Sequence, residues 1–87
     1  MTPGTRPVLT ETVDARAGVV RLDGHLTSQG ADLVEGLVEG LHRSGHRRVL
    51  VDAHGVSSAD AGARALLASL PARLAGFGGD LRITVLP

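Results

Sequence analysis

The fold is decided by residues 49–67, which read VLVDAHGVSSADAGARALL. Three consecutive apolar residues open this stretch, and they predict a buried central strand over residues 47–53. A polar segment follows, and residues 54–61 are expected to form a loop. Leucines at helical spacing then predict a helix over residues 62–76. A strand, a loop and a helix in this order are typical of a β-α-β crossover unit.

The same alternation of patterns extends outward to both sides of this stretch. Residues 8–13 and 18–26 alternate apolar with polar side chains, which predicts two strands joined as an antiparallel hairpin. Residues 29–43 repeat apolar side chains at helical spacing, after Thr27 and Ser28 as N-cap candidates. Residues 81–86 predict a last strand. Proline lacks a backbone N–H, so Pro71 is expected to kink or break the second helix.

The order of these elements predicts an α/β fold with a small mixed sheet, β-β-α-β-α-β. Right-handed crossovers should make the last three strands parallel, with both helices packed on one face. Residues 8–87 are expected to form a single domain, and residues 1–7 a flexible N-terminal arm. The residues expected to be buried in one layer between sheet and helices are Leu33, Leu37, Leu41, Val49, Val51, Leu66, Leu70 and Ile83.

Composition excludes several classes of function. The 87 residues contain no cysteine, which excludes disulfides, thiolate nucleophiles and cysteine-based metal sites. Phe77 is the one aromatic residue, so no platform for stacking bases exists, and nine acidic residues balance nine arginines. Zero net charge argues against nucleic-acid and anionic-membrane binding. No apolar signal segment is present, so we expect a soluble, cytoplasmic protein without membrane insertion.

The polar segment contains the residue types of a Ser-His-Asp hydrolase. Ser57, Ser58 and His54 lie near Asp52 and Asp60 in sequence. A G-x-S-x-G elbow is absent, however, and such a triad is defined by geometry rather than by sequence proximity. We therefore assign no catalytic residue and expect a protein that is not an enzyme.

Metal and cofactor sites are not indicated either. His42 and His46 have the i, i+4 spacing of a helical metal pair, but Gly45 ends the helix between them. These histidines are interpreted as solvated side chains near a helix C-terminus. The polar segment does lead into a helix N-terminus, where Asp60 is expected to serve as the N-cap. No metal and no cofactor are predicted.

Residues 49–67 resemble the STAS domain, the fold of bacterial anti-sigma-factor antagonists. That family has a strand ending in Asp, here Asp52, then a small turn with a valine. A short Asp-Ser-(Ser/Ala)-Gly loop follows and opens a helix with a leucine pair, here Gly62 and Leu66-Leu67. Residues 19–26 resemble its second strand with a Gly-x-Leu ending, and residues 78–85 its later strand. The resemblance covers about residues 15–87 and describes a short, divergent member.

The chain departs from the family at the residue that is phosphorylated, a serine after the loop Asp. Alignment on Gly62 and the leucine pair places Asp60 at that serine. Alignment on Val56 places Ala61 there instead. We prefer the first, because the phase of a helix is harder to shift than the length of a loop. Neither alignment leaves a hydroxyl at the switch position, although Ser57 and Ser58 lie earlier in the loop.

The resemblance implies a non-enzymatic protein-interaction module of bacterial regulation that switches partners. Its partner would be an anti-sigma factor or a serine-kinase-like ATPase. Two alternatives stay open: an accessory subunit of a transporter or other ATPase assembly, and a sensor of a small ligand or nucleotide. The expected partner-binding loop consists of Ser57, Ser58, Asp60, Ala61, Gly62 and Arg64.

The chain is also expected to be able to form a homodimer. Family members usually continue with more secondary structure after the strand that matches residues 81–86. An uncovered edge at that strand would offer unpaired backbone groups to a second copy.

Overall fold

The structure, a computed structural model, describes residues 9–84. Its elements follow the predicted order: β1 (Thr10–Asp14), β2 (Val19–Leu26), α1 (Ser28–Arg43), β3 (Arg48–Ala59), α2 (Ala61–Ala75) and β4 (Asp80–Ile83). The predicted arm, residues 1–7, lies outside the described residues, as do residues 85 and 86 of the predicted last strand.

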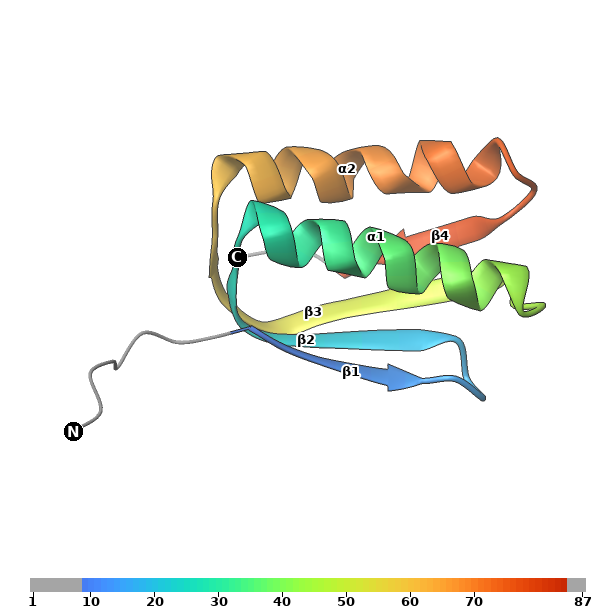
Figure 1. The fold of residues 1–87 in the computed structure, drawn as a ribbon, viewed down its shortest axis with the longest axis horizontal. Coiled ribbons are helices and arrows are strands. Elements are labelled where there is room, and N and C mark those ends of the chain that lie inside the picture. Colours follow the sequence, from blue (N-terminus) through green and yellow to red (C-terminus); the bar gives the residue numbers. More distant parts are fainter. Residues whose placement is uncertain (1–8, 85–87) are drawn as a thin grey trace.

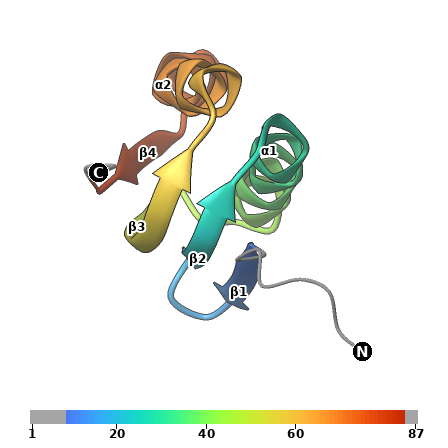
Figure 2. The same ribbon diagram turned by 90° about the vertical axis from the view of Figure 1, so that its left-hand side faces the viewer.

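The four strands form one mixed sheet in the order β1-β2-β3-β4 (Figure 1). β1 and β2 pair antiparallel, whereas β2, β3 and β4 are parallel to one another. Both helices lie against the same face of the sheet (Figure 2). This arrangement confirms the predicted fold class, and it leaves β4 at one edge. Self-association through that edge stays a prediction.

α1 begins and ends as the sequence predicts, but it presents a different face to the sheet. The Thr27 hydroxyl accepts a hydrogen bond from the Gly30 N–H at 3.0 Å, and Gly45 follows the helix with a φ of +114°. The prediction that Leu33 is buried was wrong, since this side chain is 62% exposed. Neighbouring helical residues point about 100° apart. The buried face is centred one residue later, on Gly30, Ala31, Val34, Val38 and Leu41.

The sequence predicts a kink or a break at Pro71; α2 continues through Pro71 to Ala75, so the prediction of a break was wrong. Leu67, Leu70 and Leu74 are buried on both sides of the proline. Burial of three leucines contributes several kcal/mol, which offsets the missing hydrogen bond. Leu66 lies beside this face and is only half-buried.

The core is a single layer between the sheet and the helices, as predicted. Burial of Leu41, Val49, Val51 and Leu70 is confirmed, whereas Leu37, Leu66 and Ile83 pack against the layer as half-buried residues. The sheet contributes alternate side chains, because successive residues of a strand point to opposite faces. These are Val20, Leu22, Leu26, Val49, Val51, Ala53, Val56 and Leu81.

The polar segment after the central strand is not the predicted loop. β3 continues to Ala59 and pairs with β2 up to the last residue of both strands. The pairing shifts register between Arg21 and Asp23 and again between Gly24 and His25. Polar side chains here mark exposure to solvent rather than the end of the strand. Only Asp60 separates β3 from α2.

Glu11 on β1 carries a buried carboxylate oxygen, Oε2, with no hydrogen-bond partner among the described residues. Desolvation raises the pKa of this carboxyl above its ordinary value. A raised pKa in the folded state favours the protonated acid, so the contribution of Glu11 to stability falls as pH rises through the carboxyl range. We expect Glu11→Gln to raise the free energy of unfolding at pH 7 by up to about 1 kcal/mol.

Urea denaturation of wild type and Glu11→Gln across acidic and neutral pH measures this effect. The difference in the free energy of unfolding between the two proteins should shrink toward low pH, where the wild-type carboxyl is protonated and uncharged. Asp32→Asn is the control, because Asp32 is an exposed carboxylate on α1. An equal gain from both substitutions would show that net charge rather than burial is responsible.

Candidate functional site

The carboxyl ends of β2 and β3 lie side by side where α2 begins (Figure 1). Their parallel pairing places His25 opposite Ser58 and Leu26 opposite Ala59. The Asp60 N–H continues the ladder by donating to the Leu26 carbonyl at 3.0 Å. The chain then turns into α2 at Ala61. This geometry gathers polar side chains from two strands at one end of the domain.

His25 joins two of the predicted loop residues. Its Nδ1 shares a 2.6 Å hydrogen bond with the Ser58 hydroxyl, and its Nε2 lies 3.2 Å from Asp60 Oδ1. The histidine and aspartate side chains are 33% and 52% exposed, so the group is accessible to solvent. Ser58, His25 and Asp60 therefore form one chain of polar contacts on the surface, which we call the His25 bridge.

Asp60 is the N-cap residue of α2, as predicted, but its side chain does not cap the helix. Its backbone is extended, at φ −69° and ψ 153°. Its side chain nevertheless accepts no hydrogen bond from the N–H groups of α2, every residue of which the structure describes. The carboxylate is directed to His25 instead. The prediction of side-chain capping was wrong, because a partner from another strand competes for the same oxygens.

The His25 bridge does not have the arrangement of a serine hydrolase. In those enzymes the serine contacts Nε2 of the histidine and the aspartate contacts Nδ1. Here the two contacts are exchanged between the ring nitrogens. His54, the histidine that the sequence offered for such a triad, contacts Asp52 instead of either serine.

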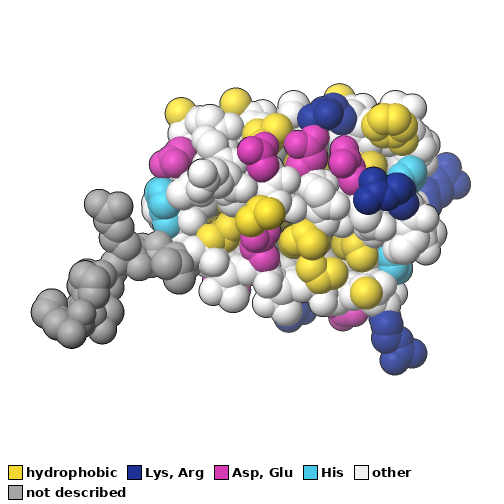
Figure 3. Space-filling view, viewed as in Figure 1, with side chains coloured by type: hydrophobic (Ala, Val, Ile, Leu, Met, Phe, Trp, Pro, Cys, Tyr) yellow, Lys and Arg dark blue, Asp and Glu magenta, His cyan; other side chains and the backbone are white. Residues whose placement is uncertain are grey.

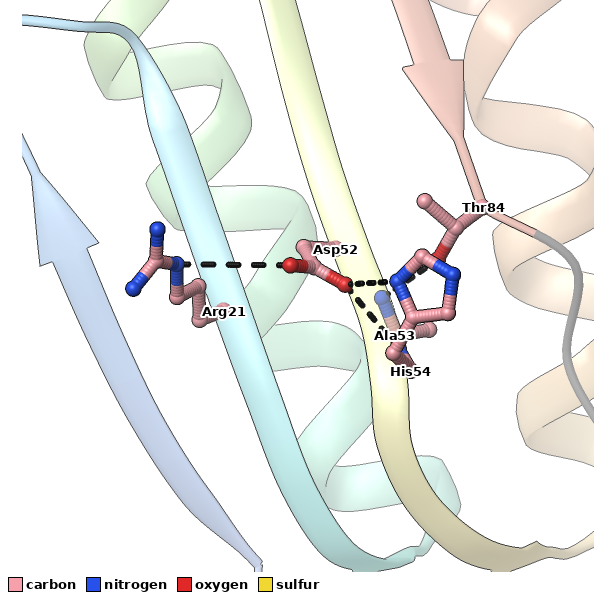
Figure 4. Close-up of polar contacts among 5 residues, drawn as sticks. All are labelled: Arg21, Asp52, Ala53, His54 and Thr84. Atoms are coloured by element: carbon pink, nitrogen blue, oxygen red, sulfur yellow. Dashed lines mark hydrogen bonds and ion pairs between the residues drawn. The ribbon is translucent and has the colours of Figure 1, made fainter.

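Asp52 and His54 belong to a separate cluster on the open face of the sheet (Figure 4). The His54 N–H donates to Asp52 Oδ1 at 3.1 Å, its Nδ1 lies 2.7 Å from the same oxygen, and Arg21 Nε lies 4.0 Å from Oδ2. The His54 backbone bond, then the imidazole, then the nearby positive charges lower the pKa of the Asp52 carboxyl. Its contribution to stability is present above the ordinary carboxyl pKa and lost as pH falls through the lower value.

A backbone contact fixes β3 next to this cluster. The Ala53 N–H donates to the Thr84 hydroxyl at 2.6 Å, and the Thr84 N–H donates to the Val51 carbonyl at 3.0 Å. Both bonds extend the β3–β4 ladder past the last residue of β4. The Asp52–His54 pair thus stands on a rigid strand, on a face that the helices leave open (Figure 2).

The predicted partner-binding residues lie on two elements and on the residue that joins them. Ser57 and Ser58 lie on β3, Asp60 lies between the elements, and the others open α2. All six are exposed: Ser57, Ser58, Asp60, Ala61, Gly62 and Arg64. Arg64 has an interaction partner of its own. A Cβ added at Gly62 would lie 2.8 Å from the Ser28 hydroxyl, which shows how closely the starts of the two helices approach.

His25 is the residue that the sequence reasoning missed. The available signal was the prediction of parallel strands, since the carboxyl ends of two parallel neighbours meet at the same edge of a sheet. No group of three or more His, Asp or Glu side chains within residues 9–84 could hold a metal ion. None of the described helices is long and apolar enough to cross a membrane.

Comparisons with known proteins agree with this geometry. A family model described as "Mlab, STAS domain" matches residues 9–87. A chain in a solved structure titled "Crystal Structure Analysis of Mglu" is 27% identical, with a TM-score of 0.66. The match covers 77% of the present chain and only 17% of that longer chain. No curated protein matches.

Proposed function

We propose a function from the premise that this chain belongs to the STAS domain family. The family generally serves in regulation, in anti-sigma antagonism or in transporters. We infer that this member is a non-enzymatic interaction module of the bacterial cytoplasm, similar to an anti-sigma-factor antagonist. Its partner is an anti-sigma factor or a serine-kinase-like ATPase, and its binding surface is centred on the His25 bridge.

The observation that carries this proposal is the carboxylate at the start of α2. The resemblance places the family's phosphorylated serine at Asp60, which has no hydroxyl for a serine kinase to phosphorylate. Asp60 supplies one negative charge, against about −1.5 to −2 for a phosphoserine. Its 3.2 Å contact with His25 Nε2 holds that charge in place. The switch is therefore fixed in the state that resembles the phosphorylated form, which binds the anti-sigma factor weakly. Phosphorylation at this position does not control it.

The surface around Asp60 suits contact with another protein. Ala61 and Gly62 are small and exposed, so a partner's backbone can approach the first turn of α2 closely. Ser57 and Ser58 present hydroxyls from the adjoining strand. A rigid strand end beside a helix start offers a preorganised surface, which lowers the entropy lost on binding.

A second candidate is an accessory subunit of a transporter or other ATPase assembly. The family itself supports this candidate, because STAS domains generally serve in transporters as well as in regulation. Both candidates use the same surface and an ATPase partner. Binding assays with an anti-sigma kinase and with a transport ATPase, run in parallel, distinguish them.

Replacement of Asp60 by serine tests the fixed switch. In this family the unphosphorylated form generally binds the anti-sigma factor and the phosphate repels it. Asp60→Ser removes the negative charge and restores a hydroxyl, so it should raise affinity for an anti-sigma serine kinase by about tenfold or more. It should also become phosphorylated by that kinase in the presence of ATP. Calorimetry and intact-mass spectrometry measure the two effects.

The controls separate charge from the other properties of the side chain. Asp60→Ala removes the charge without adding a hydroxyl, so it should bind more tightly but take up no phosphate. Both variants should change the free energy of unfolding only slightly, because the Asp60 side chain does not cap α2. A stoichiometric phosphate on wild-type Ser57 or Ser58 would contradict a fixed switch, since the acceptor would then have moved along the strand.

A further inference from the structure

The end of the domain opposite the His25 bridge carries a group of unpaired arginines. Arg16 lies in the turn between β1 and β2, Arg43 is the last residue of α1, and Arg47 and Arg48 lie where β3 begins. All four are exposed, and none forms an ion pair with a carboxylate of residues 9–84. Basic side chains gather at the right-hand end of the surface view (Figure 3). We call these four residues the arginine end.

The remaining described arginines are engaged elsewhere. Arg21, Arg73 and Arg82 contact Asp52, Glu35 and Asp80, respectively. Two carboxylates beside the arginine end are occupied as well. Asp14 accepts the Arg16 and Ala17 N–H groups at 3.1 Å, and Asp80 faces Arg82. The zero net charge of the chain therefore conceals a local positive excess.

An apolar hollow adjoins the arginine end. It encloses about 440 Å³ and is lined by Glu39, His42, Arg43, Leu74 and Phe77. Phe77, the one aromatic residue of the chain, is 71% exposed at its rim, whereas Leu74 is buried. A second, polar hollow of about 480 Å³ is lined by Gly45, His46, Arg47, Arg48 and Asp80. Apolar and cationic hollows thus share one end of the domain.

We propose that the arginine end binds an acidic protein segment that carries a large apolar side chain. The apolar side chain would enter the hollow between Leu74 and Phe77. Carboxylates on either side of it would pair with Arg43, Arg47 and Arg48, whose guanidinium groups match a carboxylate bidentately. Exposed arginine and aromatic side chains are enriched where proteins bind one another.

The same features favour a protein segment over a lipid surface or a nucleic acid. Phosphates of a lipid or a nucleic acid would pair with the arginines but would leave the apolar hollow between Leu74 and Phe77 unfilled. A hollow that admits one side chain fits a peptide better than a flat bilayer. The arginine end lies away from Asp60, so a segment bound there leaves the His25 bridge free. The domain would then link two partners.

A labelled peptide tests this proposal on the full chain. The probe is a fluorescein-labelled peptide in which glutamates flank a central Leu-Phe pair, and fluorescence anisotropy measures its affinity. We expect saturable binding that weakens with salt, because exposed ion pairs are screened. Arg47→Glu with Arg48→Glu should lower the affinity by about tenfold or more, and Phe77→Ser by about fivefold. Arg43→Gln, which removes one positive charge without introducing a negative one, should also lower the affinity for the peptide.

Matched controls make the outcome decisive. Arg21→Glu is compared with the single substitution Arg47→Glu: it makes the same charge change on the open sheet face and should bind the peptide as wild type does. Asp60→Ser should bind it equally well, so a failure here is distinguishable from a failure of the proposed switch. Equal loss in Arg21→Glu and Arg47→Glu would overturn the proposal. So would undiminished binding of a peptide without its Leu-Phe pair, or tighter binding of phosphatidylglycerol vesicles or duplex DNA.

Discussion

Leu67→Ala is expected to lower the free energy of unfolding by about 2–5 kcal/mol. Leu67 is 1% exposed and belongs to the core layer between α2 and the sheet. Its truncation removes apolar contacts and leaves a cavity, because close-packed neighbours relax only partly. Stability of a domain this small is of similar size, so the variant should be largely unfolded at 37 °C. Urea denaturation followed by circular dichroism measures the loss.

The preceding residue provides the matched control. Leu66→Ala makes the same chemical change one position earlier on α2, where the side chain is half-buried. It should cost clearly less, about 1–2 kcal/mol. Leu33→Ala, at a side chain that is 62% exposed, should cost less than about 0.5 kcal/mol. Equal losses at Leu66 and Leu67 would contradict the orientation of α2 against the sheet.

Gly55→Val should be the next most damaging change, with a cost of about 1–3 kcal/mol. A Cβ at this position would lie 1.8 Å from Asp23 Oδ1 and 2.9 Å from the Leu22 carbonyl oxygen. The aspartate can rotate away, but the carbonyl belongs to the backbone of β2 and cannot. Gly55 pairs with Asp23 beside a register shift of the two strands. The substitution should therefore also disturb the strand that carries Ser58.

Two further variants isolate the steric effect. Gly55→Val combined with Asp23→Ala relieves the contact with the carboxylate but leaves the contact with the carbonyl, so it should recover only part of the loss. Gly36→Ala adds a methyl group where no atom lies within 4 Å, and it should be neutral or stabilising by up to about 1 kcal/mol. Thermal unfolding of the four proteins provides the comparison. Wild-type stability of Gly55→Val would refute the close approach of β2 and β3.

Two of the three residues of the His25 bridge could be identified from the sequence, and the third could not. Ser58 and Asp60 were identified from the polar segment and its resemblance to the family. His25 was not, because it contacts Ser58 from 33 positions away in sequence. The sequence predicted that the Asp60 side chain caps α2, whereas in the folded chain this side chain contacts the imidazole of His25 on β2. Sequence proximity predicts only those partners that the local backbone can reach.

The sequence by itself determined the order of strands and helices, the parallel direction of the last three strands and an N-cap for α1 at Thr27 or Ser28. Each of these follows from patterns within one segment or from the handedness of crossovers. The tertiary structure alone decided the extension of β3 to Ala59, the outward position of Leu33 and the gathering of four arginines at one end. These features depend on how β2 and β3 stay paired through irregular register, and on the exact rotation of α1 against the sheet. Residues distant in sequence make both contacts, so no local pattern encodes them.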